Sequence, residues 1–136
     1  MIDAKRPLKK AIYARLQGSL RAIDGQTIVL VGNSVPQGSM MPYVQLGESY
    51  ANPLTLHAEK QGQEVTVTLH VWSAYDGDEE ADHIIDQIER ALSSPRLAVT
   101  GFSLPLSELD YSDVMIDPTG TCRHGTVRWR AQLYEV

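Results

Sequence analysis

A strand whose two faces differ in chemistry constrains this chain most. Over residues 64–74 every second side chain is aliphatic, and the side chains between them are polar or aromatic. The aliphatic set is Val65, Val67, Leu69 and Val71, and the alternate set is Thr66, Thr68, His70 and Trp72. Successive strand residues point to opposite sides of a sheet, so the aliphatic side must lie on a core. The other side is expected to be solvated or covered by another molecule.

Two amphipathic helices are predicted to cover the aliphatic side. Residues 76–94 carry apolar side chains at helical spacing and acidic residues in the first turns, where the helix dipole favours them. The apolar set is Ala81, Ile84, Ile85, Ile88, Ala91 and Leu92. The first segment, 1–21, repeats an apolar residue every four positions, with Asp3 as the expected N-cap. Those repeated residues are Leu8, Ile12, Leu16 and Leu20.

The remaining sequence is typical of strands and turns. Strands are predicted at residues 27–31, 43–48, 97–106, 111–116 and 126–134. Gly101 is expected to mark a bulge, and Asp117-Pro118-Thr119-Gly120 has turn chemistry that predicts a hairpin. Regular βαβ alternation is missing, which favours an α+β fold: a mostly antiparallel sheet with two helices packed on one face. We expect one domain, residues 1–136.

Composition excludes several classes of protein. Apolar residues make up 43% of the chain and charged residues 21%. Such values indicate a globular chain rather than a disordered one. A net charge of −5 argues against bulk electrostatic binding of nucleic acid. One cysteine allows no internal disulfide. The longest apolar run, 28–31, is too short to span a membrane, and no signal peptide is indicated.

The charge is divided between two opposed segments. Residues 1–21 hold six basic residues and one acidic residue, whereas residues 76–90 hold seven acidic residues and one basic residue. Such segments can match between subunits, or can neighbour each other within one chain. The acidic run lacks the ligand spacing of a calcium loop, so a helix start on a solvated surface is the first interpretation and a docking patch the second.

Candidate catalytic and metal-binding groups are few. Cys122 and His124, with Asp117 nearby, are the nearest approach to a nucleophile, a base and an orienting acid. A turn and a strand start explain these residues better, because catalytic Cys and His usually come from distant segments. The four histidines share no ligand spacing, so no metal and no cofactor is predicted.

Several residue patterns are typical of a protein interface. The last strand carries a row of arginines: Arg123, Arg128 and Arg130. They are expected to make either cross-strand ion pairs or intersubunit contacts. The Gly/Pro/Ser-rich loop at residues 32–39 ends at Met40 and Met41, which are adaptable contact residues. An assembly protein is therefore favoured over an enzyme.

The chain resembles the tail-completion proteins of long non-contractile-tailed phages and related gene transfer agents, also called tail terminators or tail-to-head joining proteins. The resemblance lies in an ordered set of motifs along nearly the whole chain. They are Leu8 with Ala11-Ile12-Tyr13-Ala14-Arg15-Leu16, Val35-Pro36, Pro42-Tyr43-Val44, Gly47-Glu48, Val67-Thr68-Leu69-His70-Val71-Trp72-Ser73, the acidic helix, Thr121-Cys122-Arg123-His124-Gly125, and Val127-Arg128-Trp129-Arg130-Ala131. The His-Val-Trp-Ser and Arg-His-Gly stretches are the specific ones.

The resemblance implies a structural virion protein without catalysis. Such a subunit, made in the bacterial cytoplasm, would form a homo-oligomeric ring, typically a hexamer, at the head-proximal end of the tail tube. The ring would stop tube growth and contact the tail tube protein and the head connector. DNA would pass through its lumen without sequence readout, and no membrane is involved.

A subset of residues is predicted to lie at these contacts. They are Val35, Pro36, Met40, Met41, Pro42, Tyr43, His70, Trp72, Asp76, Glu79, Glu80, Arg123, His124, Arg128 and Arg130. The alternatives are a small cysteine hydrolase using Cys122 and His124, or another head–tail connector or tail-tube-like subunit.

Overall fold

A computed structural model describes residues 3–32, 40–57 and 60–136. Two helices and five strands alternate along these residues as helix, strands, helix, strands. They are α1 (Lys5–Leu16), β1 (Val29–Val31), β2 (Tyr43–His57), β3 (Lys60–Ser73), α2 (Glu79–Ser93), β4 (Phe102–Ile116) and β5 (Arg123–Glu135). Neither of these two helices is long and apolar enough to cross a membrane.

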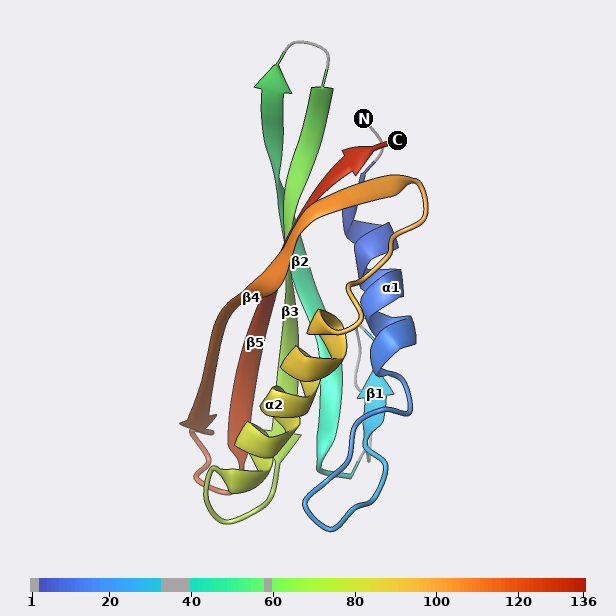
Figure 1. The fold of residues 1–136 in the computed structure, drawn as a ribbon. Helices are drawn as coiled ribbons and strands as arrows, with labels where there is room; N and C mark the ends of the chain where they lie inside the picture. The colour runs from blue at the N-terminus through green and yellow to red at the C-terminus, as the bar shows by residue number, and fades with distance from the viewer. Residues whose placement is uncertain (1–2, 33–39, 58–59) are drawn as a thin grey trace.

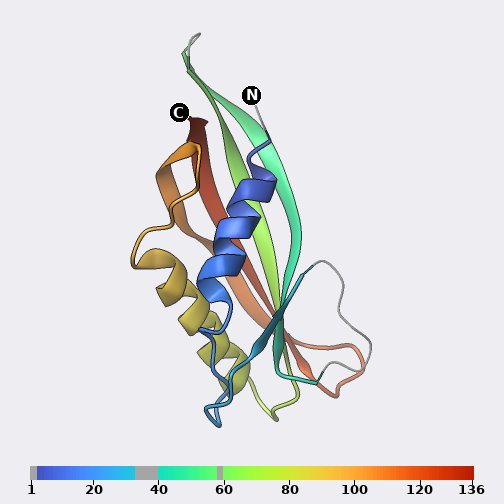
Figure 2. The same ribbon diagram turned by 90° about the vertical axis from the view of Figure 1, so that its right-hand side faces the viewer.

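The strands form one sheet in the order β1-β2-β3-β5-β4. The short β1 pairs in parallel with the start of β2, and the other three pairings are antiparallel. Both helices lie on the same side of the sheet, α1 over β2 and β3 and α2 over β3, β5 and β4 (Figures 1 and 2). The predicted α+β fold, with two helices on one face, is confirmed.

The core fills the layer between helices and sheet. The aliphatic set of β3 is fully buried, as the alternation predicts, and the apolar faces of both helices pack on it. The alternate residues of β5 complete the sheet side of the core. These are Val127, Trp129, Ala131 and Leu133, all at 0% exposure. We call this the covered face, and the opposite side of the sheet the outer face.

The cap of helix α1 differs from the prediction by one residue. Ala4 occupies the N-cap position in place of Asp3, and the Asp3 carboxylate accepts a hydrogen bond from the Lys5 amide at 3.0 Å. Asp3 therefore satisfies an early amide of the helix from just outside it. Pro7 lies in the first turn, where an amide proton is not needed.

The β2–β3 hairpin is much longer than predicted. Residues 49–57 continue β2 beyond the expected end, and β3 starts four residues early, so the hairpin projects past the helices (Figure 1). The sequence signal is weak because Pro53 interrupts the strand pattern and no described side chain of residues 49–55 is buried.

The prediction for the region of strand β4 is also wrong in part. In place of the two expected strands, 97–106 and 111–116, there is one strand, Phe102–Ile116. Residues 97–101 lie before it and are not in a strand, and Gly101 has a φ of +89° there rather than a place in a bulge. The bulges fall between Ser103 and Leu106 and between Leu109 and Tyr111. The polar residues between the expected strands stay in the sheet because β5 supplies them with partners: the Ser107 hydroxyl accepts from Trp129 Nε1 at 3.0 Å.

Candidate functional site: the outer face and the two charged ends

One row of side chains crosses all five strands on the outer face. Val29, Tyr43, Trp72, His124 and Met115 are register partners in turn, so their side chains share one side of the sheet. The two ends of this transverse row are 62% and 61% exposed. The predicted position of Trp72 on the side away from the helices is confirmed, and the sheet brings Tyr43 and His124 beside it.

Three side chains of the outer face are linked in a chain. His70 Nδ1 lies 2.8 Å from His124 Nε2, and His70 Nε2 lies 3.0 Å from the Glu48 carboxylate. The His124 ring in turn stacks on Trp72, with ring centroids 4.1 Å apart and planes within 2° of parallel. We call His70 and His124 the histidine pair. Strands β2, β3 and β5 each contribute at least one member of this cluster.

A bulge in β2 makes room for the cluster. The register shifts between Leu46 and Ser49, so that Gly47 and Glu48 together oppose a single β3 residue. A Cβ on Gly47 would lie 2.8 Å from His70 Cδ2, which is closer than van der Waals contact allows. The glycine therefore lets the imidazole lie against the β2 backbone, where it reaches Glu48.

The two pKa shifts in this cluster have different causes. The pKa of His124 is lowered, first by burial and then by the neighbouring His70, and the carboxylates of Asp113, Asp117 and Glu48 oppose this only in part. The pKa of Glu48 is lowered, chiefly by its hydrogen bond from His70.

The rest of the outer face is a ladder of cross-strand polar contacts. Arg128 lies over the Tyr111 ring at 5.0 Å, and the Tyr111 hydroxyl donates to Asp113 at 2.6 Å. Arg130 pairs with Glu108. The expected cross-strand ion pair is confirmed for Arg130, whereas the cross-strand contact of Arg128 is with an aromatic ring. The predicted role of both arginines in an intersubunit contact stays a prediction.

Three buried polar atoms remain without a hydrogen-bond partner in the described part of the chain. They are Trp72 Nε1, Asp113 Oδ1 and Arg130 Nε. All three side chains belong to the outer face, by their register with β3 and β5. Buried polar groups are nearly always satisfied, so this side of the sheet differs from the core in still having unmet hydrogen-bonding capacity.

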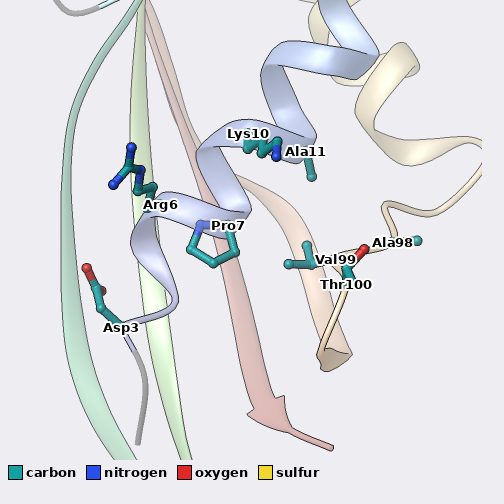
Figure 3. Close-up of a pocket in the computed structure, with 8 residues that line it drawn as sticks. All are labelled: Asp3, Arg6, Pro7, Lys10, Ala11, Ala98, Val99 and Thr100. Atoms are coloured by element: carbon teal, nitrogen blue, oxygen red, sulfur yellow. The ribbon is translucent and has the colours of Figure 1, made fainter.

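Four of the five basic residues of α1, namely Lys5, Arg6, Lys9 and Lys10, lie in the first half of the helix. Arg6 and Lys10 line a hollow with Asp3 and with residues 98–100, which precede β4 (Figure 3). Lys5 and Lys9 border a second hollow on the β2 side of the helix. The two helices do neighbour each other within the chain, and Arg15 joins them by donating to the Ala91 and Pro95 carbonyls at 2.7 and 2.5 Å.

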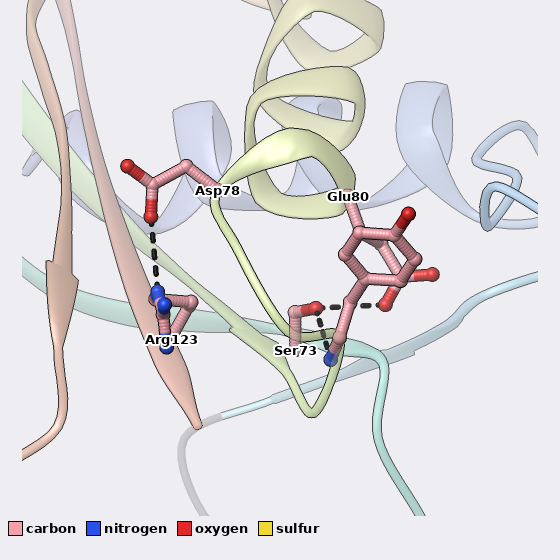
Figure 4. Close-up of polar contacts among 5 residues, drawn as sticks. Ser73, Asp78, Glu80 and Arg123 are labelled. Atoms are coloured by element: carbon pink, nitrogen blue, oxygen red, sulfur yellow. Dashed lines mark hydrogen bonds and ion pairs between the residues drawn. The ribbon is translucent and has the colours of Figure 1, made fainter. Parts of the chain in front are cut away.

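Some of the acidic side chains at the start of α2 already have partners within the chain (Figure 4). Arg123 Nε donates to Asp78 at 3.0 Å, and the Ser73 hydroxyl donates to Glu80 at 2.8 Å. Glu80 is only 7% exposed and also accepts from the Ile23 amide. The sequence predicts Glu80 at an interface, but its carboxylate anchors α2 to the end of β3. Asp76 and Glu79 are exposed, and Glu79 accepts from the Tyr75 hydroxyl.

The candidate catalytic residues are arranged for other roles. Cys122 is 6% exposed, and its carbonyl accepts from the Asp117 amide to close the turn before β5. His124 directs Nε2 to His70 and its ring face to Trp72. Within residues 3–32, 40–57 and 60–136, no three His, Cys, Asp or Glu residues are placed to hold a metal ion.

The loop before β2 is only partly described. Val35 and Pro36 lie outside the described residues. Met40 is 86% exposed and Met41 37% exposed, and Pro42 leads directly into β2. The expected Asp117–Gly120 turn is confirmed by a 2.7 Å hydrogen bond from the Gly120 amide to the Asp117 carbonyl.

Sequence reasoning missed Glu48, Tyr111 and Asp113 as members of the outer-face network. A signal for Glu48 was present, since a glycine inside a strand pattern often marks a bulge that redirects the next side chain. Nothing in the sequence indicates that Tyr111 and Asp113 lie beside Arg128 and His124, because that depends on the register between β4 and β5.

The sequence matches a known protein family over most of its length. The model of the family described as tail completion protein gp17 matches residues 10–134. The chain belongs to this family. It is therefore a structural tail protein of a phage-like virion, as the resemblance implied. The tail completion protein gp17 of Bacillus phage SPP1 is 26% identical over 127 residues, which is 93% of this chain and 92% of that protein.

Two solved structures share the fold of this family member. A chain from the virion of a native gene transfer agent particle superposes with a TM-score of 0.73 at 16% identity, covering 93% of this chain and 94% of that one. The bacteriophage SPP1 gp17 structure gives a TM-score of 0.60 at 24% identity, covering 98% and 91%. At these identities the likeness establishes the fold.

Proposed function

We propose that this family member forms a ring, most simply a hexamer, on the head-proximal end of the tail tube. The ring terminates the tail and joins it to the head connector, and DNA passes through its lumen without base readout. Family membership supports the setting. A ring requires one surface of each subunit to bind a different surface of the next. The main support for a ring is therefore that the sheet of the described residues has two unlike open edges.

The two open edges are β4 and the part of β2 that β1 does not cover. Within the described ranges, β1 pairs with only the first three residues of β2, and β4 is the last strand in the sheet order. Free edges tend to add strands from other chains. Edge pairing between copies would continue the sheet from one subunit to the next.

Only one stretch of β4 is suited to such pairing. Pro105 and two bulges interrupt the first part of the strand, and both features discourage edge pairing. Residues 111–116 pair with β5 in unbroken register, and Met115 and Ile116 are 61% and 59% exposed. We therefore assign the subunit contact on this side to residues 111–116.

Charge gives a second complementary pair of surfaces. The exposed basic side chains of Arg6 and Lys10 lie on the first half of α1, whereas Asp76 and Asp82 lie around the start of α2, at the opposite end of the sheet (Figure 1). Opposite charges at opposite ends favour head-to-tail contacts between copies over back-to-back ones. Met40 and Met41 remain candidates for contacts with the tube or the connector.

The test is assembly on tail tubes. Sedimentation velocity should find the purified protein alone as a monomer or a weak oligomer, and electron microscopy should show it as a ring on one end of added tubes. Tubes that are never capped, and that stop at the correct length without this protein, would refute the proposal. A protein that binds isolated connectors but not tubes would instead have a connector-side role.

A matched pair of variants separates the edge contact from general surface effects. Ile116→Lys places a charge on the proposed edge, which should abolish capping while leaving the circular dichroism spectrum unchanged. Val136→Lys places the same charge on a residue that is 86% exposed and outside the sheet. It should leave capping intact, and equal loss in both variants would exclude residues 111–116 as the contact.

A further inference from the structure

The histidine pair restricts how many protons its members can hold. The two facing nitrogens, His70 Nδ1 and His124 Nε2, are 2.8 Å apart. At this separation one nitrogen must carry a proton and the other must not. With both rings neutral, His70 donates from Nε2 to Glu48 and accepts at Nδ1 from His124. When one proton is added, the shared proton passes to His70 Nδ1 and the added proton is held on His124 Nδ1, so the shared hydrogen bond reverses its direction but is kept. The contact therefore survives with zero or one extra proton.

A second added proton is different. Both facing nitrogens then carry hydrogen and both rings carry positive charge, so the hydrogen bond is lost and the two rings repel. His70 has room to move, because it borders a hollow lined by Lys9, Gln45, Gly47 and Glu48. His124 has less, because Trp72 covers one ring face, and a charged imidazole is attracted to an indole face.

We propose that the histidine pair is a pH-operated switch on the outer face. It stays closed until both imidazoles are protonated, and then opens by releasing His70 toward Glu48 and solvent while His124 stays on Trp72. Opening turns the neutral centre of the transverse row into a positively charged one. The switch operates within a single chain and does not depend on ring formation.

Groups on every neighbouring element contribute to this titration. Glu48 on β2, Asp113 on β4 and Asp117 in the following turn favour protonation of His124. His70 on β3 and burial oppose it, and the pKa of His124 is lowered as a result. Arg128 on β5 and Lys9 on α1 are the nearby permanent cations around Glu48 and His70.

The direct test needs no substitution. Long-range ¹H–¹⁵N spectra of the histidine rings, recorded between pH 8 and pH 5 on the full chain, should show His70 and His124 sharing two transitions, with the tautomer of His124 changing at the first. His83 is exposed on α2, away from the histidine pair, and its ring signals serve as the internal reference. If the pair titrates as two independent rings with the midpoint of His83, there is no switch.

Variants make the same test through tryptophan fluorescence. Protonated imidazole quenches a stacked indole, so emission from Trp72 should fall at the second transition. His124→Gln should remove this step, and His70→Gln should move it up by about half a pH unit, a threefold change in proton affinity, by removing the like charge. His83→Gln should leave it unchanged. An emission step that persists in His124→Gln would overturn the proposal, and the wild-type spectra decide the matter if a variant fails to fold.

Discussion

The covered and outer faces of the sheet are made by alternate residues of the same strands, yet they are stabilised in different ways. The covered face uses shape and burial, with Trp129 as its largest fully buried side chain. On the outer face only the middle is removed from water, where Thr66 and Thr68 are each 3% exposed, and long polar and aromatic side chains lie around them, with Met115 at the margin 61% exposed. Position on a strand thus determines whether a side chain contributes mainly to stability or to a polar network that a partner can contact.

The largest difference should appear when each face loses its tryptophan. Trp129→Ala should lower the free energy of unfolding by about 3–5 kcal/mol, because it opens a core cavity and leaves the Ser107 hydroxyl without its partner. Trp72→Ala should cost less than half as much. Urea denaturation measures both, and equal costs would remove the distinction between the faces.

The next largest loss of stability is expected when the buried carboxylate at the start of α2 is removed. Glu80→Ala should destabilise by about 1–3 kcal/mol, because the Ser73 hydroxyl and the Ile23 amide lose their acceptor. Asp82 lies on the exposed side of the same helix. Asp82→Ala should therefore fall within about 0.5 kcal/mol of wild type. If thermal melting finds the two variants alike, Glu80 is not the anchor.

The bulge glycine tests how tightly the outer face is packed. Gly47→Ala should cost about 1–3 kcal/mol, because the new methyl group displaces the His70 ring. Gly32→Ala is the control, since a Cβ there meets no atom of the described residues within 4 Å. If chemical denaturation finds Gly47→Ala as stable as wild type, the His70 ring can move aside at little cost in free energy.

Acid should lower the stability of the whole chain through two groups of the outer face. The pKa of His124 is lower in the folded chain, so the unfolded chain takes up the proton first, and stability falls as the pH drops below the ordinary histidine value of about 6.5. The lowered pKa of Glu48 adds a further loss as its carboxylate is protonated at lower pH. Urea midpoints from pH 7.5 to 5.5 should fall in wild type and in His83→Gln, and fall less in His124→Gln.

The smallest effect is expected on the solvent side of α2. Arg90 and Asp86 form an exposed pair at 2.9 Å. Such pairs contribute roughly 0.5 kcal/mol or less in a helix. Arg90→Ala should therefore barely move the denaturation midpoint. A cost above about 1 kcal/mol would mean that this surface is more constrained than its exposure indicates.

Periodicity predicted the covered face well, because the burial of Val65, Leu69 and Ile88 follows directly from the spacing of apolar residues. It placed Trp72 on the correct side of its strand for the same reason. The contacts among Glu48, His70 and His124 could not be predicted, since they depend on the β2 bulge and on the register of β3 with β5, which is distant in sequence. Periodicity divides the long strand β4 into two for a related reason. Its polar residues are paired with β5, and that pairing cannot be inferred from the spacing of residues in the sequence.

The β2–β3 hairpin has a mechanical consequence. Strand β5 pairs with β3 only as far as Gly62, opposite Tyr134, and beyond this point the described hairpin residues form two strands that extend past both helices (Figure 2). The hairpin is thus a cantilever held at its base, where the Tyr134 ring lies against Gly62 and the Gln63 side chain accepts from the Ala4 amide at 3.0 Å. Bending should concentrate at that base, so amide protons beyond it should exchange with solvent faster than those of the five-stranded part.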